Sequence, residues 1–363
     1  MADRVFLHIG APKSGSTYLQ TILWANKVAL RRAGVLVPGE RRSSHGVAAV
    51  WARTPEPTRS QQKTWHQLSS ELAGWPSTVI LSSEWFTRVP RRLIPRLLDE
   101  LRPAEINIVF TARNLAEAVP AAWQERLKLG DSLPLDGFLE SMRTHQNWSW
   151  RNLDARKALP KWEKQLGPEM IHLVTVPPRD APRDLLWNRF AAACDVDPSV
   201  ATLDTAFANA SLSAEGARLL ELMGPQLRDA VDADIVRGLV PHKWIRDYLS
   251  HTLLAAQNGH PIALLESELQ IINARSRRLV DTVSAAQYQI HGDLNDLLDG
   301  TIRNNAVRPD AVDEAVLLKH AMGIIPPMLG QLRNGRLALD RERKKSAALS
   351  AEVAALREKL TSE

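Results

Sequence analysis

The sequence predicts an α/β protein in which a P-loop-like, mostly parallel sheet is flanked by helices and followed by an α-helical C-terminal region. Short apolar runs recur through the first 200 residues, helical stretches separate them, and none of the runs alternates cleanly with polar residues. Strands that are buried on both faces of a parallel sheet have this continuous apolar pattern. The predicted strands are Val5–Ile9, Val79–Leu81, Ile106–Phe110 and Ile171–Val176.

Helical patterns occupy the connections between these strands. The predicted helices are Thr17–Arg32, Arg91–Leu101, Ala116–Leu129 and Leu153–Leu166. After Pro198 the strand signals stop, and helical patterns cover residues 213–256, 266–287 and the tail from Asp313 onward. We therefore predict three regions: an α/β core at 1–200, a helical extension packed on it at 201–300, and C-terminal helices at 301–363.

Composition narrows the classes of protein that the chain can belong to. Of 363 residues, 44% are hydrophobic and 24% are charged, as in folded globular proteins. A single cysteine, Cys194, excludes an intrachain disulfide and multi-cysteine metal sites.

The sequence has neither a signal-peptide pattern nor an apolar run of the about 18–20 residues that span a bilayer, so we expect a cytoplasmic protein. The net charge of +5 suits an anionic ligand such as a nucleotide, and without interleaved basic and aromatic tracts we expect no nucleic-acid partner.

The C-terminal tail carries a short apolar seam. Leu349, Val353, Leu356 and Leu360 alternate at four- and three-residue spacing, as in a coiled coil. Two heptads are fewer than such an assignment needs. The sequence leaves open a frayed or docked terminal helix and a homodimer that forms through the C-terminal helices.

The first predicted strand runs directly into a glycine-containing loop, Gly10-Ala-Pro-Lys-Ser-Gly-Ser-Thr17. A buried strand, a tight loop and a helix that starts at Ser16 or Thr17 direct backbone N–H groups and the positive end of a helix at one point, which favours anion binding. The glycine spacing is that of the ATP-binding motif G-x-x-x-x-G-K-[ST]. Here Lys13 lies inside the loop and Ser16 takes the place of that lysine, so the segment predicts a phosphate site that does not match MgATP.

The segment Pro12–Thr17 resembles the 5′-phosphosulfate loop of sulfotransferases that use 3′-phosphoadenosine 5′-phosphosulfate (PAPS), commonly P-K-[ST]-G-[ST]-T. The resemblance extends over roughly residues 4–200. It implies PAPS as the sulfuryl donor and a loop whose residues all contact it. The implied cofactor-binding residues are Pro12, Lys13, Ser14, Gly15, Ser16 and Thr17.

The second signature of that family is a strand ending in arginine, followed eight residues later by a serine. The two residues hold the 3′-phosphate. In this chain Arg113 ends the strand, and its planar guanidinium suits bidentate phosphate binding. Ala121 stands where the serine is expected, in a P-x-x-W-Q-E stretch that resembles a bacterial subgroup. One neutral hydrogen bond contributes about 0.5–1.5 kcal/mol, so the alanine should weaken binding without abolishing it.

The resemblance implies in-line attack of an acceptor hydroxyl on sulfur. Lys13, with the loop amides and Thr17, would stabilise the charge on the leaving oxygen. Glu84, which follows the predicted strand Val79–Leu81, is the first candidate for the general base, although it could instead cap a helix or pair with Arg88. His145 is the second candidate, and an ordinary surface histidine is the alternative there.

Other aromatic and titratable residues have less specific interpretations. His8, Trp187 and Phe190 are expected in the core. The histidines show no metal-ligand spacing, and we predict no metal site.

We therefore predict a PAPS-dependent sulfotransferase. Its acceptor is expected to be a small molecule or glycan: a hydroxyl of a carbohydrate, a lipid-linked sugar or a secondary metabolite, with Trp85, Trp123 and Trp148 as candidates for a stacking wall. One alternative is a P-loop kinase, which needs an acidic strand end for Mg²⁺, a role that only Glu84 could take. The other is a nucleotide-binding scaffold without turnover, in which Ala121 marks loss of the site.

Overall fold

The computed structural model describes residues 2–144, 148–203, 211–230, 241–301 and 303–362. The chain forms two compact units. The larger comprises residues 1–126, 133–209 and 263–304, and it contains the whole β-sheet. The smaller comprises residues 127–132, 210–262 and 305–363 and is helical in its described part.

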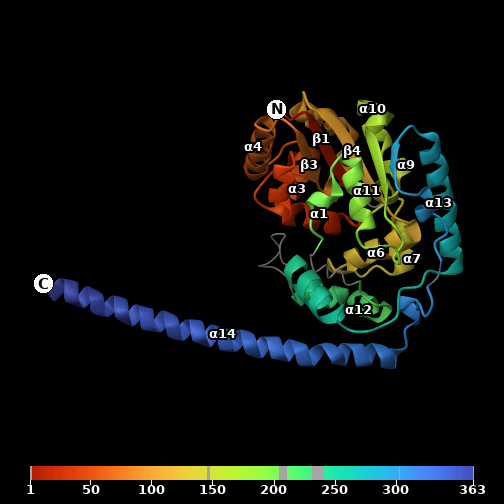
Figure 1. Cartoon of the computed structure of the whole chain (residues 1–363). Coiled ribbons are helices and arrows are strands. Elements are labelled where there is room, and N and C mark those ends of the chain that lie inside the picture. The colour runs from red at the N-terminus through yellow and green to blue at the C-terminus, as the bar shows by residue number, and fades with distance from the viewer. Residues whose placement is uncertain (1, 145–147, 204–210, 231–240, 302, 363) are drawn as a thin grey trace. The chain divides into compact units, whose positions relative to one another are not determined.

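The sheet has six parallel strands in the order β2-β3-β1-β4-β5-β6, which confirms the predicted fold class (Figure 1). All four predicted strands are present. The strands are β1 (Arg4–Gly10), β2 (Val35–Leu36), β3 (Thr78–Ser82), β4 (Glu105–Ala112), β5 (Ile171–Thr175) and β6 (Gln289–His291).

The two edge strands were not predicted, and β6 corrects the expectation that no strand follows Pro198. They have only two and three residues, and β6 is partly exposed. Backbone pairing with β3 and β5 defines them. The apolar run at β2 is only three residues long, Val35-Leu36-Val37, and β6 has no apolar run.

The strand order places a switch point between β1 and β4, where the chain connections diverge. The chain leaves β1 toward β2 and leaves β4 toward β5, on opposite sides of the β1–β4 pair. Right-handed crossovers then place the two connecting segments on opposite faces. Ligands of such sheets bind at the carboxyl ends of the two strands that diverge. Here those ends are Gly10 and Ala112.

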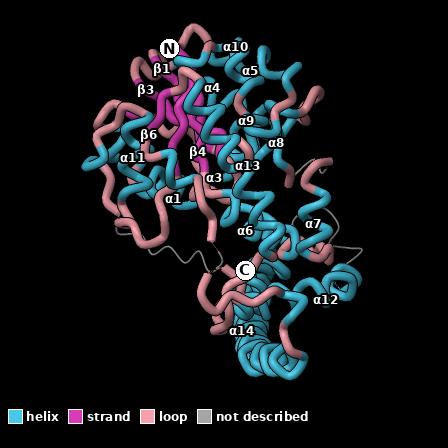
Figure 2. Tube along the Cα trace, turned by 90° about the vertical axis from the view of Figure 1, so that its right-hand side faces the viewer, coloured by secondary structure: helices cyan, strands magenta, loops and turns pink. Residues whose placement is uncertain are grey.

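Helices flank both faces of the sheet (Figures 1 and 2). Those before β4 are α1 (Ser16–Ala25), α2 (Lys27–Arg32), α3 (Arg42–Arg53), α4 (Arg59–Ala73) and α5 (Ile94–Leu101). Those after β4 are α6 (Leu115–Leu127), α7 (Leu135–Ser141), α8 (Trp150–Leu153), α9 (Ala155–Ala158), α10 (Pro160–Leu166), α11 (Leu185–Ala193) and α13 (Glu266–Ala285).

Two predicted helices are broken in the structure. The stretch 17–32 divides at Asn26, whose side-chain amide donates to the carbonyl oxygens of Ile22 and Thr202. The stretch 153–166 belongs to three short helices, of which α9 begins after the capping side chain of Asp154 and α10 begins at Pro160. Proline lacks the N–H that would continue the preceding helix. Helices α3 and α4 were not predicted.

One face of the sheet packs against α1, α2 and α11. This core includes Phe6, Leu19, Ile22, Leu23, Leu30, Ile80, Val109, Val174, Trp187 and Phe190. The expectation of core positions for Trp187 and Phe190 is therefore confirmed. His8 is also fully buried, with its ring edge-on to Phe190 at 5.1 Å between centroids.

The smaller unit contains α12 (Ala214–Ala230), a π-helix (Pro241–Leu254) and α14 (Glu314–Ser362). The 49-residue helix α14 contacts both of the others. Further along α14, Leu349, Val353 and Leu356 are exposed by 61%, 47% and 54%, whereas the side chain of Leu360 lies outside the described residues. The homodimer through these helices stays a prediction.

Among the described helices, none has the length and apolarity needed to cross a membrane.

A buried histidine joins the end of β3 to the loop after β2. The Nδ1 atom of His45 accepts from the backbone N–H of Ser82 at 3.1 Å, and Nε2 lies 2.9 Å from the carbonyl oxygen of Pro38. The ring therefore carries its proton on Nε2 and is uncharged. Burial lowers the pKa of His45 to about 4, and burial lowers the pKa of His8 to about 3.

We predict that the protein loses stability as the pH falls from 6.5 to 4. In this window unfolded histidines, with a pKa near 6.5, bind protons that the two native rings do not. The free energy of unfolding should therefore fall by up to about 1.4 kcal/mol per pH unit for each ring. Urea unfolding between pH 4.5 and 7.5 measures the slope. His45→Gln should reduce the slope of the unfolding free energy against pH by up to about 1.4 kcal/mol per pH unit. His66→Gln, at an exposed position, should leave the slope unchanged. Equal slopes in all three proteins would contradict the prediction.

Candidate functional site

The loop between β1 and α1 has three residues with left-handed backbone conformations. The φ angles are 93° at Gly10, 64° at Lys13 and 81° at Gly15. A Cβ on Gly10 would lie 2.8 Å from the Cβ of Glu84, and one on Gly15 would lie 2.5 Å from Cδ2 of Leu186. Both positions therefore favour glycine by conformation, and Gly10 is also required by space because the backbone of Glu84 lies beside it. For Lys13 this conformation costs roughly 1–2 kcal/mol, the kind of local strain that is concentrated at functional sites.

This backbone path leads into the N-terminus of α1. The helix begins at Ser16 after Gly15, and no described side chain caps it. The first-turn amides and the positive end of the helix dipole are thus available to an anion. Pro12 and Ser16 are buried, and Thr17 is exposed.

A chain of buried hydrogen bonds holds the loop from beneath. Ser14 Oγ donates to the carbonyl oxygen of Ala11 and is bonded to Thr111 Oγ1. Thr111 Oγ1 lies 3.3 Å from Nε2 of His8, whose Nδ1 is 2.7 Å from Ser82 Oγ. The four side chains are at most 3% exposed. The Ser14 hydroxyl therefore points into the protein and anchors the loop to β4.

Lys13 and Arg113, which the sequence assigned to the same cofactor, lie together. A guanidinium N–H of Arg113 donates to the carbonyl oxygen of Lys13 at 3.2 Å. The Lys13 Nζ is 2.9 Å from Oε1 of Glu125, which lies on α6 with a side chain only 10% exposed. The loop after β1, the end of β4 and α6 thus meet beside the carboxyl ends of β1 and β4.

Arg113 also belongs to an ion cluster centred on Glu117. Its Nε donates to Glu117 Oε2 at 3.0 Å, and its Nη2 binds the same oxygen. Arg179 and Arg303 contact the other carboxylate oxygen, at 3.1 and 3.5 Å. Burial by itself would raise the pKa of Glu117, but these arginines lower it below its ordinary value. Both cations that the sequence assigned to the cofactor therefore pair with carboxylates of α6.

Glu84 stands at the rim of the loop. It opens a short 3-10 helix (Glu84–Arg88) directly after β3. Gln20 of α1 donates through Nε2 to Glu84 Oε2 at 3.2 Å, and Arg42 in turn donates to the Gln20 side-chain oxygen at 3.0 Å. Together with the close approach of Gly10, these bonds place the carboxylate beside the start of the loop 10–17.

Trp85 and Arg88, on the same 3-10 helix as Glu84, belong to a cluster of aromatic rings and arginines. The guanidinium carbon of Arg88 is 3.7 Å from the ring centroid of Trp85 and 5.7 Å from that of Trp148, and Arg53 is 5.8 Å from Trp85. Burial and the neighbouring Arg53 lower the pKa of Arg88 to about 9, while Glu84 opposes the shift. Trp85 is partly exposed, and Trp148 is 8% exposed.

Three other positions that the sequence singled out are Trp123, Ala121 and His145. Trp123 is fully buried and its indole N–H donates to the carbonyl oxygen of Leu133, so it belongs to the core and not to a stacking wall. Ala121 is half-buried on α6. His145 lies outside the described residues.

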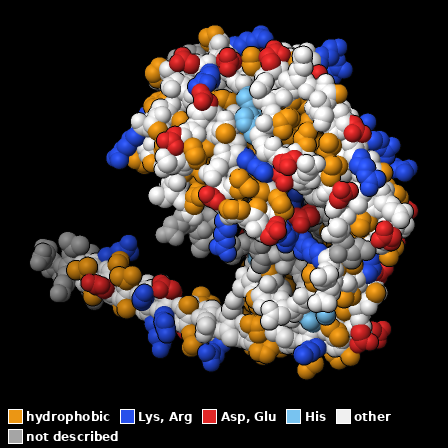
Figure 3. All heavy atoms as spheres, turned by 45° about the vertical axis from the view of Figure 1, so that its right-hand side comes forward, with side chains coloured by type: hydrophobic (Ala, Val, Ile, Leu, Met, Phe, Trp, Pro, Cys, Tyr) orange, Lys and Arg blue, Asp and Glu red, His pale blue; other side chains and the backbone are white. Residues whose placement is uncertain are grey.

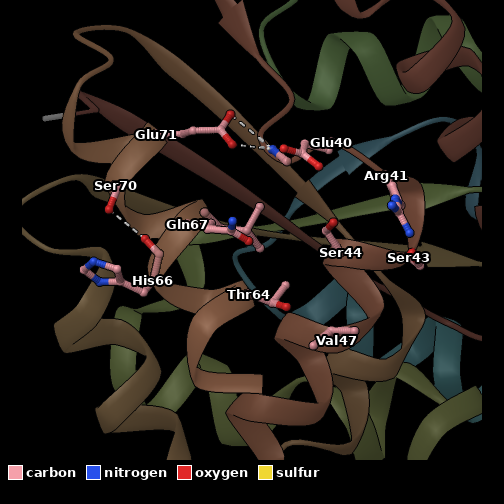
Figure 4. Close-up of a pocket in the computed structure, with 12 residues that line it drawn as sticks. Glu40, Arg41, Ser43, Ser44, Val47, Thr64, His66, Gln67, Ser70 and Glu71 are labelled. Atoms are coloured by element: carbon pink, nitrogen blue, oxygen red, sulfur yellow. Dashed lines mark hydrogen bonds between the residues drawn. The ribbon is translucent and has the colours of Figure 1, made fainter. Parts of the chain in front are cut away.

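A surface pocket of about 510 Å³ lies elsewhere on the larger unit, between the loop after β2 and helices α3 and α4 (Figure 4). Its lining includes Glu40, Arg41, Ser44, His66 and Glu71, and both carboxylate oxygens of Glu71 accept from the Gly39 amide. It shares no residue with the predicted site, and its two glutamates make it a poor phosphate pocket.

The surface charge is mixed. Basic and acidic side chains are interspersed over the visible face, without a broad field of one sign (Figure 3). Among the described residues, no three His, Cys, Asp or Glu side chains are grouped to hold a metal ion.

Several residues of the site were not assigned a role from the sequence. Glu117 follows Arg113 by one helical turn, a spacing that could have identified the pair. Glu125 lies in the stretch 120–125 that carried the family resemblance, without a role attached. Arg179 and Arg303 come from distant loops, and nothing in their local sequence indicates the cluster.

No protein-family model and no curated protein sequence matches the chain. Among solved structures, a sulfotransferase from Alicyclobacillus acidocaldarius is similar, with a TM-score of 0.36 and 12% sequence identity. The match covers 63% of this chain and 96% of that chain.

We predict that Gly15→Ala destabilises the protein, whereas Gly46→Ala does not. The first change forces a left-handed alanine, which costs roughly 1–2 kcal/mol, and places its methyl group against Leu186. The second lies inside α3 with no heavy atom within 4 Å of the added Cβ, and alanine there should stabilise by about 0.5–1 kcal/mol. Calorimetric melting of both variants tests the contrast, which fails if Gly15→Ala melts at or above wild type.

Proposed function

We propose that the protein is a sulfotransferase that moves the sulfuryl group of PAPS to a hydroxyl of a carbohydrate, a lipid-linked sugar or a secondary metabolite. The observation that carries this proposal is the junction of the loop 10–17 with Arg113. A left-handed loop and an uncapped helix N-terminus suit one phosphate group, and Lys13 lies within that loop. Arg113, bonded to the Lys13 carbonyl, offers a second cation at the end of the neighbouring strand. Two adjacent anion sites suit a nucleotide that carries phosphates at two positions.

The geometry favours this function over that of a MgATP-dependent kinase. A kinase of this fold needs a carboxylate at a strand end to hold Mg²⁺. Strand β4 ends in Thr111 and Ala112 and is followed by Arg113, and the Thr111 hydroxyl is engaged by Ser14. The place of the ATP-binding lysine is taken by the buried Ser16.

In the proposed reaction the donor supplies an activated sulfuryl group, and this chain supplies charge stabilisation and a base. The acceptor oxygen forms a bond to sulfur while the bond from sulfur to the phosphate oxygen breaks. Lys13 and the loop amides stabilise the negative charge on the departing phosphate. Glu84 takes the hydroxyl proton, from the rim that faces the start of the loop. Glu125 holds the Lys13 ammonium until an anion competes for it.

The first test is calorimetric titration with adenosine 3′,5′-bisphosphate and, separately, with MgATP. Wild type should bind the bisphosphate in preference. Lys13→Ala and Arg113→Ala should each weaken it by about 10- to 100-fold, because hydrogen bonds to charged groups contribute about 1.5–3 kcal/mol. The exposed Lys63→Ala is the matched control.

Absence of bisphosphate binding, or a preference for MgATP, would overturn the proposal in favour of the kinase. Tight binding without sulfuryl transfer to a broad panel of hydroxyl acceptors would instead identify a nucleotide-binding scaffold.

The second test concerns the base. Glu84→Gln should lower kcat by about 10²- to 10⁴-fold, the usual contribution of general-base catalysis, and should leave bisphosphate affinity unchanged. Its pH–rate profile should also lose the limb that reports deprotonation of the base. Glu352→Gln, on the exposed part of α14, is the control. Unchanged kcat in Glu84→Gln would remove Glu84 from the mechanism.

A further inference from the structure

Three arginines from separate parts of the larger unit converge on one carboxylate. Arg113 follows β4, Arg179 follows β5, and Arg303 lies beyond β6. They contact Glu117 at 3.0, 3.1 and 3.5 Å. Within the described part of the chain, every ion pair recorded for these arginines ends on Glu117.

The cluster carries more positive charge than it neutralises. Three guanidinium groups and one carboxylate leave a formal charge of +2. The arginines also oppose one another, since burial first, and then Arg179 and Arg113, lower the pKa of Arg303. An additional anion would relieve this repulsion.

The groups are accessible to a ligand. The side chains of Arg113, Arg179 and Arg303 are exposed by 20%, 53% and 41%, and that of Glu117 by 31%. Guanidinium groups bind phosphate oxygens through paired N–H donors. A phosphate monoester, with a charge near −2 and three acceptor oxygens, matches both the excess charge and the number of arginines.

The cluster adjoins the phosphate loop through Arg113, whose Nη1 donates to the Lys13 carbonyl. A ligand that reaches from the loop to the cluster meets cations at two places, which suits a nucleotide with phosphate groups at two positions. Ala121 lies on the same helix as Glu117, and its side chain has no hydroxyl to donate to a phosphate. The affinity for a phosphate at this place must therefore come from charged groups.

We propose that Arg179 and Arg303 join Arg113 in binding the 3′-phosphate of the nucleotide, and that Glu117 occupies this place in the free protein as an internal competitor. The inference rests on the proposed function. When the nucleotide binds, its phosphate oxygens replace the Glu117 carboxylate as the partners of the three arginines. The nucleotide affinity therefore depends on the difference between these two interactions.

The test compares two nucleotides that differ only in the 3′-phosphate. Adenosine 3′,5′-bisphosphate and adenosine 5′-monophosphate are titrated calorimetrically into wild type, Arg179→Gln, Arg303→Gln and Glu117→Gln. Each arginine variant should weaken the bisphosphate about 3- to 30-fold, less than a buried charged hydrogen bond because the groups are partly exposed. Affinity for the monophosphate should stay within about twofold. Glu117→Gln should bind the bisphosphate more tightly than wild type.

Arg102→Gln, which removes an exposed arginine paired with Asp99, is the matched control and should bind both nucleotides as wild type does. Thermal melting verifies that each variant is folded. Salt dependence gives a second measurement on wild type and the conservative Arg179→Lys. Both should show a bisphosphate affinity that falls more steeply with salt than that of Arg179→Gln, because they retain the charge.

The outcomes separate the two proposals. If wild type binds neither nucleotide, the proposed function fails. If wild type binds the bisphosphate but the arginine variants lose both nucleotides equally, or lose neither, the cluster is not the 3′-phosphate site. If Glu117→Gln weakens the bisphosphate, Glu117 positions the arginines and does not compete, which overturns that part of the inference.

Discussion

The site depends on a buried chain of hydrogen bonds that crosses the carboxyl ends of three adjacent strands. It runs from Ser82 on β3 through His8 on β1 and Thr111 on β4 to Ser14 in the loop. Buried polar groups must find partners, so the loop folds with the Ser14 hydroxyl inward. Lys13, the preceding residue, has a left-handed conformation, and its ammonium group pairs with Glu125. Because burial keeps His8 uncharged, the network holds the loop without placing a cation beneath the proposed phosphate.

Helix α6 sets the electrostatics around this loop. Glu125 pairs with Lys13 and Glu117 with Arg113, so both cations are already oriented in the free protein. In the function that we propose, this preorganisation favours catalysis, because the groups need little rearrangement when charge develops. It also opposes binding of the proposed nucleotide, since an incoming anion must compete with a carboxylate at each cation.

The elements that the sequence predicted well are those whose signals are local. Apolar runs predict four strands, and the glycines predict the loop 10–17. The wrong predictions concern features that depend on contacts between residues far apart in the sequence. The edge strands β2 and β6 are created by backbone pairing with neighbours. The break at Asn26 is held by a bond to Thr202, 176 residues away. Trp123 looks like an available ring in the sequence, but the fold buries it.

Local patterns in the sequence were enough to predict the α/β fold, the glycine-containing loop 10–17 and the position of Arg113 at a strand end. Each of these follows from the conformational preferences and burial of a few consecutive residues. The tertiary structure alone decided the partners of the charged groups. Glu125 reaches Lys13 across 112 positions, and Arg303 reaches Glu117 across 186. Such pairs form because the strand order and the crossovers bring distant segments together at the carboxyl ends of β1 and β4, and no local pattern of residues encodes those contacts.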